Sequence, residues 1–391
     1  MKLLTAIFLL FSLNAYAQDN YNILINTDIL DHLNISYESN ESDLAMVNVN
    51  EDTLDNIAHH SHDFNRCGGF ELIEQSETQA LNELVTQKYM SEIELMFLNF
   101  DSEPITFKEE IFLAIETLNS DNLKETVDAL SQYKTRSSRQ KKPNEHVYMM
   151  KEKVDAIIEE SELLISSSLI DHSRTKQKTL KVRIEGSDRP DEVVILGGHL
   201  DSTAFFSAAP GADDNASGSA NLMEVLRVLS LREQPKRTIE FFWYAAEEIG
   251  LIGSGEIAKS YKADQVDVIA VMQLDMTGFS GSGEFNIGNI TDFTSPWLQQ
   301  ILHTLNNHYI NAVVHEDKCG YGCSDHASWF RQGFDTVFPI EAKFRESNKK
   351  IHSSRDTMDL LNFKHSLTFS KLALSFAMEL ANSELRKPEF Q

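Results

Sequence analysis

Hydrophobic and polar residues follow two alternating patterns from residue 106 onward. Short runs of consecutive apolar residues predict strands buried on both faces, and segments with apolar residues every three or four positions predict amphipathic helices. This alternation indicates an α/β domain with a central, mostly parallel mixed sheet flanked by helices. Helices are predicted over 107–118, 121–133, 147–165, 217–229, 256–261, 296–309 and 367–381, and strands over 180–184, 193–196, 238–244, 268–274 and 336–340.

The first 17 residues have the composition of a secretory signal peptide. Lys2 precedes an apolar stretch over 6–13, and Ala15-Tyr16-Ala17 matches a small-x-small cleavage site. The alternative is a membrane anchor, which needs roughly 20 apolar residues, and neither this stretch nor any later one is that long. We therefore expect a secreted, extracellular protein that is cleaved after Ala17 and has no membrane partner.

Acidic residues are concentrated in the segment 18–105, which has 18 Asp and Glu residues against two basic ones, in a chain of net charge −25. In an exported precursor this predicts a prosegment that assists folding or blocks the site until a processing protease removes it. A permanently attached acidic domain is the alternative. Nucleic acid is not an expected partner, because phosphate contacts need clustered Lys and Arg. The one basic cluster, KTRSSRQKK over 134–142, is interpreted as an exposed loop, either solvated or sensitive to proteases.

The chain has three cysteines, Cys67, Cys319 and Cys323. Removal of the prosegment would take Cys67 with it and leave an even pair in an oxidising compartment. The sequence CGYGC over 319–323 is therefore interpreted as a disulfide loop, which contributes only ~2 kcal/mol because it encloses few residues. The alternative, a Cys-x-x-x-Cys metal half-site, lacks a second cysteine pair to complete it.

Candidate metal ligands follow the predicted strands. His199, Glu248 and Asp275 each lie just beyond an apolar run, where sites gather in open α/β sheets. Imidazole and carboxylate groups together suit a borderline cation such as zinc. Asp201 lies two residues after His199, where its carboxylate can accept a ring N–H and orient the imidazole. The full candidate ligand set is His199, Asp214, Glu248, Asp275 and His352.

Most of these candidates also have an ordinary structural interpretation. Asp213 and Asp214 lie in a Gly-rich turn and could cap the helix predicted from residue 217. Glu247 and Glu248 could be exposed loop charges, although the uncharged, mostly large residues before them argue against exposure. If one of them binds a metal, the raised pKa of its neighbour would suit a general base. His352 taken alone would be a surface histidine.

Several motifs resemble those of the di-zinc peptidases of family M28, most of all the secreted bacterial leucyl aminopeptidases. These motifs are GGHLDS, PGADDNASG, AAEEIGL, QLDMT, CGYGCSDHASW and IHSSRDT, and the resemblance covers 106–391. It implies one globular zinc-peptidase domain over 106–391 that binds two Zn²⁺ ions per subunit. In that assignment Asp214 bridges both ions, His199 and Asp275 bind one ion, and Glu248 and His352 bind the other.

The resemblance also implies the reaction. Glu247 matches the general base, which takes a proton from a water bridging the two metals and returns it to the leaving amine. Tyr321 matches a tyrosine that donates to the oxyanion. Asp201 is the residue expected to orient His199. The substrate would be a peptide or protein with a free N-terminus, because its α-amine would lie at one metal.

The positions that match the specificity pocket of the family are mostly apolar, which suits Leu or another large apolar residue at the N-terminus of the substrate. Plain core packing is the alternative role for these side chains. Ser347 departs from the pattern, because the relatives have an aromatic residue there, so the pocket is expected to be wider or wetter. The matching positions are Met276, Phe338, Ile340, Phe344 and Ile351, with Cys319, Tyr321 and Cys323 beside them.

Three other activities are weighed against a monomeric aminopeptidase. A carboxypeptidase must bind a terminal carboxylate, for which Arg345, Arg355 or Lys343 could serve. A glutaminyl cyclase on this scaffold typically uses one metal, which the five-residue ligand set argues against. A non-catalytic binding protein would lack a ligand or the base, and none of these residues is missing.

Overall fold

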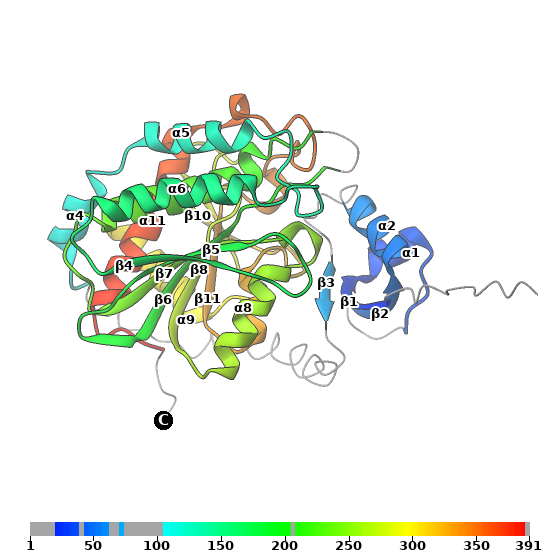
Figure 1. Cartoon of the computed structure of the whole chain (residues 1–391), viewed down its shortest axis with the longest axis horizontal. Coiled ribbons are helices and arrows are strands. Elements are labelled where there is room, and N and C mark those ends of the chain that lie inside the picture. The colour runs from blue at the N-terminus through cyan, green and yellow to red at the C-terminus, as the bar shows by residue number, and fades with distance from the viewer. Residues whose placement is uncertain (1–19, 39–42, 62–69, 74–104, 205–207, 388–391) are drawn as a thin grey trace, which may run out of the picture.

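The computed structural model of the chain describes residues 20–38, 43–61, 70–73, 105–204 and 208–387. The predicted signal peptide over 1–17 and Cys67 lie outside the described residues. Among the helices that are described, none combines the length and the apolar character that crossing a bilayer requires. The described residues form a large α/β unit over 105–387 and a small unit over 20–73, which Figure 1 shows in blue against one side of the large unit.

The large unit is built on one sheet, which has eight strands within the described residues. These strands are β4 (Ile165–Ile170), β5 (Thr179–Ile184), β6 (Arg189–His199), β7 (Arg237–Tyr244), β8 (Asp267–Gln273), β9 (Asn286–Ile290), β10 (Val313–Asp317) and β11 (Thr336–Ile340). Their order is β10-β9-β11-β8-β6-β7-β5-β4. The central strands β11, β8, β6 and β7 run parallel, and β9 and β5 pair antiparallel with their central neighbours. The predicted mixed, mostly parallel sheet is confirmed.

Helices cover both faces of this sheet (Figure 1). They are α4 (Lys108–Ile115), α5 (Ser120–Ser131), α6 (Glu145–Glu159), α7 (Gly218–Leu229), α8 (Ile252–Ala263), α9 (Pro296–Tyr309), α10 (His326–Arg331) and α11 (Phe363–Asn382). The helices α4, α5, α6, α7, α9 and α11 share one core with the sheet, and α8 and α10 pack on the opposite face.

The central strands are apolar on both faces, as their continuous apolar runs predict. In β6, Val194 and Leu196 belong to the core shared with α7 and α11, whereas Val193 and Ile195 contact the side chains of α8 and α10. Strand β7 alternates in the same way. The middle of the sheet is therefore mostly apolar. An exception is Glu240 in the middle of β7, which is fully buried and forms ion pairs with Lys181 and Arg183 of β5.

Two local predictions differ from the structure. The helix predicted over 147–165 ends at Glu159, and β4 begins at Ile165. The hydroxyl of Ser161 accepts the N–H of Leu163 at 3.2 Å and donates to the carbonyl of Ser230 at 2.7 Å, and such local side-chain bonds compete with helical ones. Strands β4, β9 and β10 were not predicted. Strand β4 contains three consecutive serines, and β9 and β10 each have only five residues and include polar ones.

The small unit lies within the acidic segment, for which no helix or strand is predicted. It contains β1 (Asn20–Asn26), α1 (Thr27–Leu33), β2 (Leu44–Asn50), α2 (Glu51–Ser61) and β3 (Phe70–Ile73). The strands form an antiparallel sheet in the order β2-β1-β3. Ile23, Ile25 and Val47 from this sheet pack with the two helices in a separate apolar core. The segment is therefore not merely a charged tail, because part of it is folded.

Candidate metal centre

The candidate ligands meet at one edge of the large sheet because three central strands are parallel. His199 is the last residue of β6, Asp275 follows β8 by two residues, and Glu248 lies on a short 3-10 helix (Glu247–Ile249) just after β7. In the ladder, His199 is opposite Tyr244, the last residue of β7. Parallel strands bring their carboxyl ends to the same edge, so these three residues lie together at that edge.

Asp214 comes from the turn that precedes α7, and this turn lies close to β8. At Gly218, the first residue of α7, a Cβ atom would lie only 2.2 Å from the carbonyl oxygen of Leu274. A residue without a side chain is therefore required for this approach. The amide of Asn215 also donates to the carbonyl of Leu274 at 3.0 Å. Together these contacts hold Asp214 beside Asp275.

The two oxygens of Asp214 face two different pairs of side chains. On one side, His199 Nε2 lies 3.1 Å from Asp214 Oδ1 and 3.4 Å from Asp275 Oδ1. On the other side, His352 Nε2 lies 2.9 Å from Asp214 Oδ2 and 3.2 Å from Glu248 Oε2. Each group has its ligand atoms within 4.8 Å of one another. This arrangement is one carboxylate shared between two clusters that can each hold a cation.

The charges of these groups indicate what the site accommodates. Asp275 Oδ1 and both carboxylate oxygens of Glu248 are buried and, among the described residues, accept no hydrogen bond of acceptable geometry. Burial opposes protonation of His352, but the carboxylates of Glu248 and Asp214 outweigh it and raise the pKa of this imidazole to about 10. Buried anionic oxygens without donors are costly. Divalent cations would neutralise them, and imidazole nitrogen with carboxylate oxygen fits zinc.

Asp201 connects the imidazole with the glutamate pair. One of its oxygens lies 3.5 Å from His199 Nδ1, in the position expected for orienting the ring. Its carboxylate also accepts the backbone N–H groups of Glu247 at 3.1 Å and Glu248 at 3.3 Å. These hydrogen bonds to the backbone were not predicted from the sequence. Through them the Asp201 carboxylate positions Glu247 and Glu248 as well as the ring of His199.

Glu247 is buried beside the clusters, with 2% of its surface exposed, so it is not an exposed loop charge. Burial raises the pKa of Glu247 well above its ordinary value; the charge of His199 opposes this shift, and Asp325, Glu248 and Asp275 add to it. Burial and Asp214 likewise raise the pKa of Glu248 to about 7. A carboxylate with a raised pKa beside a cation site can accept a proton near neutral pH.

Several residues that were given no role from the sequence form hydrogen bonds to the candidate ligands or to their neighbours. Ser324 donates to Asp275 Oδ2 at 2.6 Å. Asp356 accepts the N–H groups of Asp213 at 3.1 Å and of Asp214 at 3.1 Å, and Asn348 donates to Asp213 Oδ2 at 3.0 Å. Ser324 and Asp356 lie inside quoted motifs, but only the folded chain brings their side chains to the ligands.

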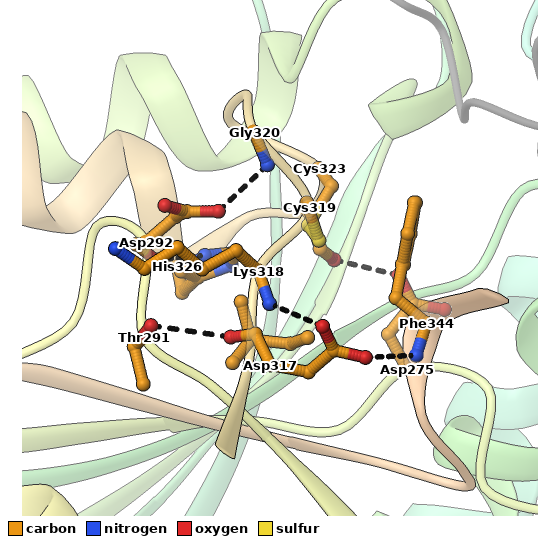
Figure 2. Close-up of a disulfide and its surroundings, with 12 residues drawn as sticks. Asp275, Thr291, Asp292, Asp317, Lys318, Cys319, Gly320, Cys323, His326 and Phe344 are labelled. Carbon is orange, nitrogen blue, oxygen red and sulfur yellow. Dashed lines mark hydrogen bonds between the residues drawn. A yellow bond between two sulfur atoms is a disulfide. The ribbon is translucent and has the colours of Figure 1, made fainter.

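The predicted disulfide is present: Cys319 and Cys323 are joined with an S–S distance of 2.00 Å. Figure 2 shows the loop between them, where the N–H of Gly320 donates to Asp292. Gly320 has a φ of +87°, which favours glycine at the tip of so short a loop. All the predicted pocket residues gather in one apolar cluster, called the pocket cluster below. Its members are Met276, Ile290, Cys319, Tyr321, Cys323, Phe338 and Ile340, with Phe344 and Ile351 partly buried against it.

Two predictions near the site need correction or detail. The basic cluster over 134–142 is not uniformly exposed, because Arg136 is fully buried, whereas Lys134, Lys141 and Lys142 are exposed as predicted. Arg136 is held by backbone carbonyls next to the metal ligands. The hydroxyl of Ser347 donates to the carbonyl of Phe344 at 2.7 Å, so this hydroxyl is hydrogen-bonded within its own loop.

An α/β sheet whose strand ends carry two imidazole–carboxylate clusters around a shared aspartate is typical of the metal-dependent hydrolases. The sequence model of peptidase family M28 matches residues 179–377. The chain belongs to peptidase family M28.

Individual relatives agree with this assignment. Leucine aminopeptidase 1 of Coccidioides posadasii is 35% identical over 305 residues, which cover 74% of this chain and 78% of the relative. The probable aminopeptidase YDR415C of Saccharomyces cerevisiae is 39% identical over 222 residues, 54% of this chain and 59% of the relative. Among solved structures, the LapA aminopeptidase of Legionella pneumophila superposes with a TM-score of 0.81 at 30% identity, covering 94% of this chain and 100% of LapA.

Proposed function

We propose that this M28 peptidase is a secreted di-zinc aminopeptidase that removes Leu or other large apolar residues from the N-termini of peptides. The observation that carries the proposal is the position of Asp214, with one oxygen 3.1 Å from His199 Nε2 and the other 2.9 Å from His352 Nε2. With Asp275 and Glu248, the five residues divide into two sets that share one carboxylate. Two zinc ions would polarise the scissile carbonyl and lower the pKa of the attacking water.

The residues of the chain have separate tasks in this proposal. Asp201 holds the backbone of Glu247 through the N–H bond at 3.1 Å and orients His199. Glu247 takes the proton of the attacking water and transfers it to the leaving amine. Tyr321, held in the disulfide loop with 3% of its surface exposed, donates to the oxyanion as it forms. The buried environment strengthens each of these electrostatic contributions.

The pocket cluster supports the proposed preference for large apolar residues. Its side chains are apolar, and Tyr321 and Phe344 make an edge-to-face ring contact at 6.4 Å between centroids. A carboxypeptidase has less support. Arg345 and Arg355 are exposed, and Lys343 lies 3.6 Å from Glu346, so none is a buried cation that could bind a terminal carboxylate.

Hydrolysis of leucyl, glutamyl and N-acetyl-leucyl amides by the processed enzyme tests this function. We expect the leucyl amide to be the best substrate, because the pocket is apolar. Acetylation should abolish turnover, and chelation of zinc should do the same. The Glu247→Ala variant should keep its zinc and lose most of its activity. Equal turnover of the acetylated amide would exclude an aminopeptidase.

We further propose that the chain is made as a precursor whose acidic segment, 18–105, covers the site until a processing protease removes it. Contacts of the small unit support this. Leu44 of β2 packs against the pocket cluster, and the amide of Asn26 donates to the carbonyl of Gly320 at 3.2 Å. Both contacts fall on the disulfide loop or the residues around it. A substrate side chain and Leu44 would therefore compete for the same apolar surface.

Strand β3 makes the second part of this contact. Glu71 forms an ion pair with Arg331 of α10, whose side chain is 11% exposed. A Cβ atom at Gly322 would lie 2.1 Å from the Glu71 carboxylate, so β3 lies close against the disulfide loop. Leu72 packs against Ala245 and Ala246, just before Glu247. The small unit thus contacts both loops that carry the proposed catalytic residues.

A further inference from the structure

Arg136 lies between α5 and α6, and it is fully buried although its sequence surroundings are basic and polar. Its guanidinium donates to backbone carbonyls. Nε donates to Leu200 at 2.9 Å, Nη2 donates to Gly211 at 2.9 Å, and Nη1 donates to Pro210 and, at 3.3 Å, to Leu130. A planar group with a rigid arrangement of donors therefore fixes the relative positions of several backbone segments.

Three of these four carbonyls lie at the two ends of the connection between two metal ligands. Leu200 directly follows His199, and Gly211 precedes Asp214 by three residues. At Gly211, which has a φ of +55°, a Cβ atom would lie 2.8 Å from Arg136 Nη2. A glycine is therefore needed for the guanidinium to approach this closely. One side chain thus connects the segment of His199 with the segment of Asp214.

The backbone of Arg136 extends the connection to the glutamate pair. Its N–H donates to Ser202 Oγ at 3.1 Å, and this hydroxyl donates to the carbonyl of Ala209 at 2.8 Å. Its carbonyl accepts the amide of Gln177 at 3.1 Å, and the other end of Gln177 accepts the N–H of Ala246 at 2.8 Å. Ala246 is the residue before Glu247. The surroundings of Arg136 thus reach three of the segments that build the site.

The charge of Arg136 is retained inside the protein. Burial lowers its pKa to about 10, and the negative charges of Asp356, Asp201, Asp214 and Glu248 oppose that shift. In the part of the chain that the structure describes, no carboxylate forms an ion pair with it, so its direct partners are carbonyl groups. Burying a guanidinium without such a pair is costly. An apolar side chain would fill the space at lower cost, so packing alone does not account for arginine here.

We propose that Arg136 is a positioning residue of the metal centre, which holds the segments of His199 and Asp214 in the relative placement that two metal ions require. The proposal rests on the metal centre of the proposed function. Residues that orient metal ligands typically change metal affinity about 10–100-fold when they are removed. Arg136 orients the backbone on both sides of the ligands, so we expect an effect in that range.

Zinc affinity of the full-length chain, measured by competition with a chromophoric chelator, tests this role. Arg136→Met should bind zinc about 10–100-fold more weakly than the unaltered protein. Arg136→Lys keeps the charge but concentrates its donors on one nitrogen, so it should recover only part of the affinity. Ser202→Ala removes the hydrogen bond between the Arg136 N–H and Ser202 Oγ but no charge. It should therefore weaken zinc binding less than Arg136→Met does.

Arg237 provides a matched control. It is also fully buried, and it donates to the carbonyls of Leu380 at 2.6 Å and Ser383 at 2.9 Å, but it lies at the start of β7, the end of the strand opposite to Glu247. Arg237→Met should lower the melting temperature and leave zinc affinity unchanged. An equal loss of zinc affinity in both methionine variants would overturn the proposal.

The remaining outcomes are also decisive. Unchanged zinc affinity in folded Arg136→Met would overturn the positioning role. If that variant does not fold, Arg136→Lys and Ser202→Ala decide, and unchanged affinity in both would overturn it. Failure of the unaltered protein to bind two zinc ions would instead refute the proposed function, so the two failures are distinguishable.

Discussion

The contact between Leu44 and the pocket cluster leads to a measurable prediction about the precursor. Leu44→Asp places a carboxylate against the apolar side chains that Leu44 contacts. A carboxylate in apolar surroundings is costly, so the small unit should dock less firmly on the catalytic domain. The variant should therefore expose the pocket more often without any change in the catalytic domain itself.

The size of the effect follows from burial. A fully buried leucine side chain contributes about 1.5–3 kcal/mol. Leu44 is only partly buried, so about half of that, ~0.75–1.5 kcal/mol, is expected to be lost. Since about 1.4 kcal/mol corresponds to a factor of ten, the uncovered population of the precursor should increase about three- to tenfold.

Initial rates on leucyl amide measure this population. We would compare the uncleaved precursor, uncleaved Leu44→Asp, and the enzyme cleaved at a protease site introduced before residue 106. The variant should be about three- to tenfold more active than the uncleaved precursor and no more active than the cleaved enzyme. Met46→Asp is the matched control, because Met46 lies two residues further on the same face of β2 and is not in the pocket cluster.

Two results would refute the reasoning. If the uncleaved precursor were as active as the cleaved enzyme, the small unit would not cover the site at all. If Leu44→Asp were as inactive as the unaltered precursor while cleavage activated both, the cover would not depend on the contact of Leu44 with the pocket cluster. Equal activation by Met46→Asp would indicate that β2 had unfolded.

Three further predictions concern the catalytic domain. Zinc added to metal-free protein should raise the melting temperature, by an amount equivalent to about 2.7 kcal/mol when free zinc is 100 times its dissociation constant. Asp214→Asn should remove most of this rise. An undiminished rise in the variant would show that the metal binds elsewhere. Replacing Cys319 and Cys323 by serine should raise KM for leucyl amide and lower stability by about 2 kcal/mol at most, because the loop is short; an unchanged KM would show that the disulfide does not shape the pocket. Burial raises the pKa of Glu256, but hydrogen bonds from His172 and Ser173 outweigh this and lower it to about 2. Its stabilising contribution should therefore be complete above about pH 4.5, the ordinary value for glutamate, and should be lost as the pH falls towards 2. Urea unfolding of Glu256→Gln should show a deficit relative to the unaltered protein at pH 7 that shrinks over this range, and a constant deficit would contradict the assignment.

Local sequence was sufficient for the central part of the fold. The apolar runs before His199, Glu247 and Asp275 predict buried parallel strands, and parallel strands place their following residues at one edge of the sheet. The position of the site and its chemical character could therefore be predicted. Strands β9 and β10 could not be predicted, because five residues that include polar ones do not show a strand pattern.

The tertiary structure decided which groups meet. Asp214 and His352 are 138 positions apart in the printed chain, and only folding places their side chains 2.9 Å from each other. Arg136 lies in a basic, polar stretch that predicts exposure, yet carbonyls supplied by the connection over 199–214 make its burial possible. Leu44 belongs to a segment without a predicted element, and its contact with the pocket cluster depends on the docking of a separate unit. Sequence periodicity reports which side of an element is buried, but it contains no information about which distant segment buries it.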